Sequence, residues 1–314
     1  MADIRGICPI IATPFTERGE VDYESLTNLL RVLAKGGCDG LTLFGIAGEY
    51  YKLSDDEMNE MTTLVVRECR AAHVPSIVSI TRHATELAIR QARFTEAAGA
   101  DCLMLLPPFF LKPGGAALYQ HIKAVSLSVN IPVMLQYAPE QTGVAMDPVF
   151  LARLADEVPN LIYFKIECRP PGAYISRLLE LTKGRIHVFI GNAGFQMIEG
   201  LDRGAAGVMP GCSMFDVYLK IYRAWQDGNR QEALRLHSEL LAMLNHIRQD
   251  VEEIILYEKR ILARRGIIKT DVCRKPSFAA DAHFDRLFDE RFEAIKPLLG
   301  DNVWTLDCKT NTAC

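Results

Sequence analysis

Several common catalytic motifs are missing from this sequence. Its seven histidines show no HExxH or other zinc spacing, and its nine cysteines include no CxxC pair, so we expect no metal site. No GxGxxG or GxxxxGK[ST] follows a strand-like run, and no GxSxG nucleophile elbow occurs. These absences argue against zinc enzymes, nucleotide-cofactor enzymes and serine hydrolases, and we expect no cofactor.

The sequence also lacks long apolar runs and a large excess of charge. No run approaches the roughly 18 apolar residues of a membrane span, and the N-terminal MADIRG has no signal-peptide pattern. A net charge of −4 argues against nucleic acid or an acidic membrane as the partner. Scattered cysteines in a chain of 314 residues are typical of reduced, mostly buried thiols, so we expect a cytoplasmic protein that binds a small molecule.

Short runs rich in Val, Ile and Leu alternate with amphipathic, helix-like segments. The expected strands are residues 4–15, 40–45, 75–80, 101–107, 132–137, 161–166, 187–192 and 207–211. The expected helices between and after them are residues 22–35, 55–72, 85–99, 115–129, 147–157, 172–183, 195–203 and 213–227. Strands joined by helical crossovers are parallel, and eight such units are the number that closes a (β/α)8 TIM barrel.

A doubly wound open sheet is the structural alternative, but no nucleotide-binding glycine motif supports it. We therefore predict an α/β barrel over residues 1–228. Residues 229–300 read as a C-terminal helical extension packed on the barrel or on a neighbouring subunit, with one or two helices at 229–265 and another at 284–298. Residues 301–314 form a polar tail.

The working residues of such a barrel lie at the C-terminal ends of its strands and in the loops that follow. This rule selects a short group of candidates. They are the stretch 45–49, Thr81, Gln136, Tyr137, Lys165, Gly191 and Met209.

Lys165 is the candidate with the clearest chemistry. It lies in the run LIYFKIE and is the only lysine inside an expected strand. An amine desolvated at the barrel mouth favours its neutral form, which can attack a ketone to give a Schiff base. The alternative is a structural ion pair with Glu167, whose carboxylate would hold the proton on the amine.

The stretch 45–49 reads GIAGE and is the second candidate. Glycines around a strand-to-helix turn let backbone N–H groups face a ligand such as a carboxylate, although an ordinary tight turn has the same composition. We expect Ile46, Ala47 and Gly48 to bind substrate, together with Thr81, Gly191 and Met209. Glu49 is expected to cap the turn rather than act as a base.

Three motifs together resemble the dihydrodipicolinate synthase/N-acetylneuraminate lyase family. They are GxxGE after the second strand, Tyr137-Ala138-Pro139 with Thr142-Gly143 after the fifth, and a lysine ending the sixth. The match runs over about residues 4–300 and includes the ATPF segment at residues 12–15. The resemblance implies a Schiff-base lysine at Lys165, a 2-oxo acid carboxylate near Ile46 and Ala47, and a homotetramer or dimer.

The departures from the family pattern bear on the substrate. Ile46 and Ala47 replace two threonines, and Gln136 stands at the position of the catalytic tyrosine, with Tyr137 one residue later. Phe110 replaces a tyrosine lent by a neighbouring subunit, and Gln141 replaces an arginine that grips a dicarboxylic intermediate. The pairing of Gln136-x-Ala138-Pro139 with Tyr163-Phe164-Lys165-Ile166-Glu167 resembles the branch of keto-deoxy sugar acid dehydratases more than the synthase itself.

The resulting hypothesis is a lyase that forms a lysine Schiff base with a small 2-oxo acid and dehydrates or cleaves a 2-keto-3-deoxy sugar acid. Lys165, Tyr137 and Gln136 are its expected catalytic residues. One alternative is a pyruvate-dependent aldolase or a synthase-like condensation, with Tyr137 as the proton shuttle. Another is a barrel that binds an oxo acid without turning it over. We expect a homo-oligomer in each case.

Overall fold

The computed structural model describes residues 3–300 and contains an eight-stranded, wholly parallel sheet. Its strands are β1 (Gly6–Ile7), β2 (Leu41–Leu43), β3 (Ser76–Ile80), β4 (Cys102–Leu105), β5 (Val133–Tyr137), β6 (Leu161–Ile166), β7 (His187–Ile190) and β8 (Gly207–Val208). Their order is β1-β8-β7-β6-β5-β4-β3-β2. Ile10 forms parallel bridges to both Thr42 and Gly211, which joins the two ends of the sheet. The predicted (β/α)8 barrel is confirmed.

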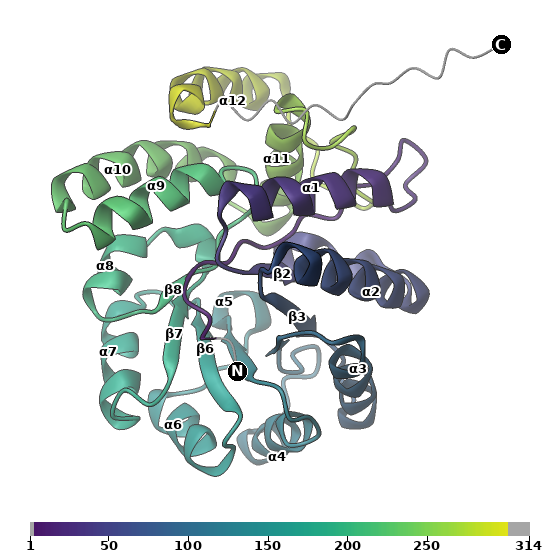
Figure 1. Ribbon diagram of the computed structural model, residues 1–314, viewed down its shortest axis with the longest axis vertical. Helices are drawn as coiled ribbons and strands as arrows, with labels where there is room; N and C mark the ends of the chain where they lie inside the picture. Colours follow the sequence, from purple (N-terminus) through teal and green to yellow (C-terminus); the bar gives the residue numbers. More distant parts are fainter. Residues whose placement is uncertain (1–2, 301–314) are drawn as a thin grey trace.

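The long helices surround the strands (Figure 1). Those of the repeating units are α1 (Tyr23–Gly36), α2 (Asp55–Ala72), α3 (Thr85–Ala98), α4 (Gly115–Ser126), α6 (Pro148–Glu157), α7 (Gly172–Leu181), α8 (Met197–Asp202) and α9 (Phe215–Gln226). A four-residue helix not expected from the sequence, α5 (Pro139–Thr142), follows β5. Short 3-10 turns occur at η1 (Ile46–Gly48), η2 (Tyr50–Lys52), η3 (Asn192–Gly194) and η4 (Lys296–Leu298).

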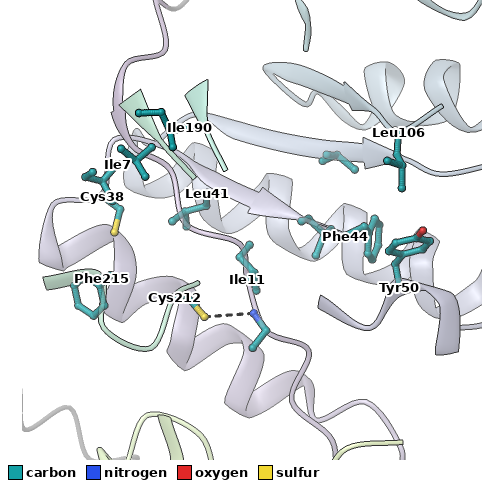
Figure 2. Packing of buried hydrophobic residues seen from close by; sticks show 14 of the residues in the cluster. Ile7, Ile11, Cys38, Leu41, Phe44, Tyr50, Leu106, Ile190, Cys212 and Phe215 are labelled. Atoms are coloured by element: carbon teal, nitrogen blue, oxygen red, sulfur yellow. Dashed lines mark hydrogen bonds between the residues drawn. The ribbon is translucent and has the colours of Figure 1, made fainter. Parts of the chain in front are cut away.

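Apolar side chains form two layers because barrel strands are buried on both faces. The inner layer fills the barrel with residues such as Met104, Met134 and Phe189. The outer layer packs the strands against the helices, and Figure 2 shows part of it, including Leu41 and Phe44. Two separate layers mean that neighbouring residues of one strand face different environments, which decides which side chains reach the barrel interior.

The first strand is much shorter than the segment 4–15 predicted for it. Regular pairing covers only Gly6–Ile7, and the chain then continues irregularly with single bridges. Pro9 and Pro14 lie in this segment, and proline has no N–H to donate to a sheet ladder. In this irregular stretch, the N–H of Ala12 donates to Cys212 Sγ at 3.4 Å (Figure 2).

Three further helices follow the repeating units, α10 (Arg230–Ile247), α11 (Val251–Arg264) and α12 (Ala282–Ile295). The stretch 229–265 is thus two helices, which was one of the two expected possibilities. Helix α10 packs against α9 and α12, and α11 contacts η1. Through α11 the C-terminal helices therefore reach the loop that follows β2.

Within residues 3–300, no helix is both long enough and apolar enough to cross a membrane. The cysteines in this part of the chain are free thiols, and Cys8, Cys38, Cys69, Cys102 and Cys212 are buried. The predicted polar tail 301–314 lies outside the described residues.

Arg274 ties the segment after α11 to the start of α2. Its guanidinium donates to the Glu57 carboxylate, with one contact of 2.8 Å, and to the carbonyls of Gly19 and Lys52. Glu57 also accepts from Ser54 N in the capping box of α2. The hydrogen bonds from Arg274 are the main reason that the pKa of Glu57 is lowered to about 2.

We expect Glu57→Gln to reduce stability in a pH-dependent way. A carboxyl whose pKa is lowered on folding stabilises the protein fully above its unfolded value of 4.5, and this stabilisation is lost as the pH falls toward about 2. Glutamine keeps the capping interaction, so the variant isolates the charge. Urea titrations should show a deficit below about 1 kcal/mol at pH 7 because solvent screens the pair. A deficit that stayed constant down to pH 2 would contradict this assignment.

Candidate active site

Lys165 lies on the inner face of the barrel near the C-terminal end of β6. Its strand neighbours Phe164 and Ile166 pack in the outer layer, so the period of two turns Lys165 inward. The side chain is only 3% exposed, and it lines a cavity at the barrel mouth. The sequence pattern predicted this placement.

Glu167 lies beside the amine. Its Oε1 is 3.3 Å from Lys165 Nζ and also accepts a hydrogen bond from the N–H of Asn192 at 3.0 Å. Its Oε2 accepts from Gln136 Nε2 at 2.6 Å. Gln136 is the register partner of Lys165 on β5, which brings its amide to the same side of the sheet. Glu167 therefore accepts hydrogen bonds from two neutral groups, Gln136 and Asn192, in addition to its contact with Lys165.

Burial by itself raises the pKa of the Glu167 carboxyl. The nearby Lys165 charge and the hydrogen bonds from Asn192 and Gln136 outweigh burial, and the pKa lies below its ordinary value. Glu167 is therefore a stable anion next to the amine. Gly191 leaves room for it, because a Cβ there would lie 2.2 Å from Glu167 Cγ.

Two connected cavities open above the lysine. The inner one, called here the lysine cavity, has a volume of about 50 Å³, and Lys165, Glu167, Ala47 and Met209 are among its lining residues. The outer cavity has a volume of about 600 Å³. Four residues line both and form the neck between them: Ile46, Gln141, Arg248 and Val251. The lysine cavity and the outer cavity therefore adjoin one another at the barrel mouth.

The turn η1 contributes two residues to the lining of the lysine cavity. Ile46 and Ala47 both line it, and they begin a helical turn, where N–H groups have no partner inside the helix. Gly48 is already engaged, because its N–H donates to Gly45 O at 2.8 Å and its carbonyl accepts from Thr13 Oγ1 at 2.6 Å. The donors that this turn can offer a ligand are therefore those of Ile46 and Ala47.

Two predicted site residues lie elsewhere. Tyr137 belongs to the outer layer, where its ring stacks on Tyr174 with centroids 4.9 Å apart, and burial raises the pKa of its phenol. The backbone N–H of Thr81 donates to Gln91 Oε1 at 3.3 Å, and Thr81 lines neither cavity. The structure thus brings Gln136 and Glu167 to Lys165 but does not bring Tyr137 or Thr81.

Two arginines that the sequence did not single out converge on Asn192. Arg169 and Arg248 each donate to Asn192 Oδ1 at 2.9 Å. Arg169 also lies 3.4 Å from Glu140, in a largely exposed ion pair. Asn192 and Ala193 adopt left-handed φ angles of 50° and 53°, which are uncommon without glycine and occur preferentially at functional sites. No local pattern in the sequence signals that Arg248 reaches the barrel mouth.

The arrangement suits a reaction through an amine. A buried lysine faces a cavity, a carboxylate that accepts from Gln136 and Asn192 lies 3.3 Å from the amine, and Ile46 and Ala47 line the same cavity. The described residues include no cluster of three or more His, Cys, Asp or Glu side chains suited to a metal ion.

Comparisons with known proteins show the family and the fold to which this chain is similar. A model of the dihydrodipicolinate synthetase family matches residues 3–290. An L-2-keto-3-deoxyarabonate dehydratase of Azospirillum brasilense is 28% identical over 276 residues, which are 87% of this chain and 88% of that protein. A 4-hydroxy-tetrahydrodipicolinate synthase of Methanothrix thermoacetophila is 31% identical over 76% of this chain and 80% of its own. The dihydrodipicolinate synthase structure from Aquifex aeolicus superposes with a TM-score of 0.86 at 24% identity, covering 95% of this chain and 99% of that one.

Proposed function

The chain belongs to the dihydrodipicolinate synthetase family, and on that premise we propose that it is a Schiff-base lyase that dehydrates a 2-keto-3-deoxy sugar acid. The observation that carries the proposal is the buried amine of Lys165, which faces a cavity and lies 3.3 Å from a carboxylate held by two other donors. The similarity to a keto-deoxy sugar acid dehydratase supports the choice of reaction.

In the proposed first step the neutral amine of Lys165 adds to the C2 carbonyl of the substrate. The carbonyl oxygen leaves as water, and an iminium remains on Nζ. Only the unprotonated amine has the lone pair that attacks the carbonyl carbon. Gln136 and Asn192 donate to Glu167 and hold its carboxylate in place beside the amine.

Glu167 then acts on the intermediate. The iminium nitrogen is cationic, and a fixed carboxylate at the Lys165 Nζ position stabilises that charge in a site with little water. The iminium draws electrons from C3, so the C3 proton leaves, the C4–O bond breaks and water departs. Hydrolysis of the conjugated iminium releases a dehydrated 2-oxo acid and restores the amine.

The choice of dehydration over carbon–carbon cleavage rests on the side chains near the amine. A retro-aldol step needs a group that takes a proton from the C4 hydroxyl, and a phenol is suited to that task. Gln136 is a non-titrating amide, and Tyr137 packs in the outer layer. We assign Gln136 a positioning role, because it holds Glu167 by a hydrogen bond of 2.6 Å.

Product analysis tests the proposal. We expect the protein, incubated with a panel of 2-keto-3-deoxy sugar acids, to convert at least one into a dehydrated 2-oxo acid, detected by mass spectrometry. Release of pyruvate together with an aldehyde would instead identify an aldolase. Trapping of an oxo acid by borohydride without any turnover across the panel would identify a binding protein.

We also propose that the chain assembles with copies of itself. Phe110 and Leu111, in the loop before α4, are 80% and 85% exposed, and adjacent apolar side chains with that exposure favour a contact. Analytical ultracentrifugation should give a mass that is two or more times the 35.1 kDa of one chain. A monomer at micromolar concentration would contradict this part of the proposal.

A further inference from the structure

The neck between the two cavities contains the cationic side chain of Arg248, whose hydrogen-bond partner, Asn192, is neutral. Arg248 follows α10, lines both cavities and donates to Asn192 Oδ1 at 2.9 Å. Among residues 3–300 no carboxylate oxygen lies within 4.0 Å of its guanidinium. A partly buried arginine in this situation is poorly compensated, and an anionic group of a ligand would complete it.

The surroundings of Arg248 add to the excess of positive charge. Arg169 approaches the same oxygen of Asn192, so two guanidinium groups share one neutral acceptor. Burial and the charge of Arg169 both lower the pKa of Arg248, while Glu167, Glu140 and Asp250 raise it by a smaller amount. The free-energy cost of keeping the Arg248 guanidinium charged and partly buried decreases when an anion binds beside it.

A second, independent feature of the lysine cavity is a pair of buried polar atoms without a partner among the described residues. Asn192 is 5% exposed, and its Nδ2 has no hydrogen-bond acceptor among the described residues. Its orientation is determined by the two arginines, because only the oxygen of the amide can accept from both. Gln141 Oε1 is likewise buried without a partner. Asn192 and Gln141 both line the lysine cavity, so a polar ligand would satisfy them.

We propose that Arg248 binds a distal carboxylate of the substrate, so that the substrate is a 2-keto-3-deoxy sugar acid with a carboxylate at each end. The carboxylate next to the reacting carbonyl has the amides of Ile46 and Ala47 within the lysine cavity, beside the amine. Arg248 lies at the neck, through which the rest of the substrate extends into the outer cavity. An anion at that point belongs to the far end of a short carbon chain. This inference rests on the proposed Schiff base at Lys165.

Matched ligands test the inference. In the presence of cyanoborohydride the iminium carbon accepts a hydride and leaves a stable secondary amine on Lys165, which mass spectrometry counts. 2-Oxoglutarate and 2-oxopentanoate have the same chain length and differ in the distal carboxylate. We expect half-maximal trapping of the wild-type protein at a roughly 10- to 100-fold lower concentration of 2-oxoglutarate, the ratio typical of one charge-assisted contact.

Arg248→Met should abolish this preference by weakening the trapping of 2-oxoglutarate far more than that of 2-oxopentanoate, whereas Arg248→Lys should retain part of the preference. Arg235→Met is the matched control, because Arg235 lies on the exposed face of α10 in an ion pair with Glu232. Circular dichroism and thermal melting establish that each variant is folded.

Three results are decisive. An equal loss for both ligands in Arg248→Met would overturn the inference, because Arg248 would then contact the carboxylate that they share. Equal trapping of both ligands by the wild-type protein would overturn it as well. Failure to trap any oxo acid, pyruvate included, would instead contradict the Schiff base, so the two failures are distinguishable.

Discussion

Replacing Lys165 with arginine is expected to lower kcat by at least about 10⁴-fold while the protein stays folded. A guanidinium keeps a positive charge beside Glu167, but it remains protonated at any working pH and cannot form an iminium. Arginine can replace lysine as the partner of Glu167 in the ion pair, but it cannot act as the nucleophile. The variant therefore tests the nucleophilic role alone. Turnover of the best substrate and the mass of the borohydride-treated protein are the two measurements.

A second variant guards against a packing effect of the larger side chain. Truncating Lys165 alone would leave Glu167 as a buried anion with only neutral donors, so a loss of activity could follow from a loss of stability. Lys165→Met combined with Glu167→Gln removes both charges and keeps similar volumes. This pair should fold and be inactive. Activity within tenfold of the parent in either variant would show that Lys165 is not the nucleophile.

The largest expected effect on stability comes from Lys259, which joins α11 to the loop after β2. Its ammonium donates to Glu49 and to the carbonyl of Val272, and both side chains of the ion pair are 0% exposed. Lys259→Met should lower the free energy of unfolding by about 3–5 kcal/mol, because a buried carboxylate then loses its main partner. Chemical denaturation monitored by circular dichroism measures the change.

Two comparisons make this prediction specific. Glu49→Gln with Lys259→Met leaves no buried charge at the pair, so the double variant should be more stable than the sum of the single losses predicts. Arg286→Met breaks an exposed pair with Glu290 and should change stability by less than about 0.5 kcal/mol. A loss below about 1 kcal/mol in Lys259→Met would mean that Lys52, which is 3.2 Å from Glu49, compensates the charge alone.

The same pair connects stability with the site. Glu49 closes the GIAGE stretch, and α11 contacts the turn that carries Ile46 and Ala47. The sequence suggested a local cap for Glu49, and its actual partner lies 210 residues away. Substitutions at Lys259 that leave the protein folded therefore act on a part of the lysine cavity as well.

The sequence alone was sufficient to predict the barrel and the position of its amine. Both follow from short-range rules: apolar runs alternating with amphipathic helices give parallel units, and the period of two along β6 places Lys165 opposite Phe164 and Ile166. The end of regular pairing after β1 also has a local cause in its prolines. These features need no knowledge of which distant segments meet.

Only the tertiary structure decided what surrounds the amine. The register between β5 and β6 brings Gln136 to Glu167 and leaves Tyr137 outside, and the packing of α10 and α11 brings Arg248 to Asn192. Local sequence patterns do not distinguish the roles of two adjacent residues of one strand. They also do not indicate which distant segment an arginine after a helix will contact. Such contacts depend on how whole elements pack, because burial and charge compensation are properties of the assembled barrel rather than of any segment.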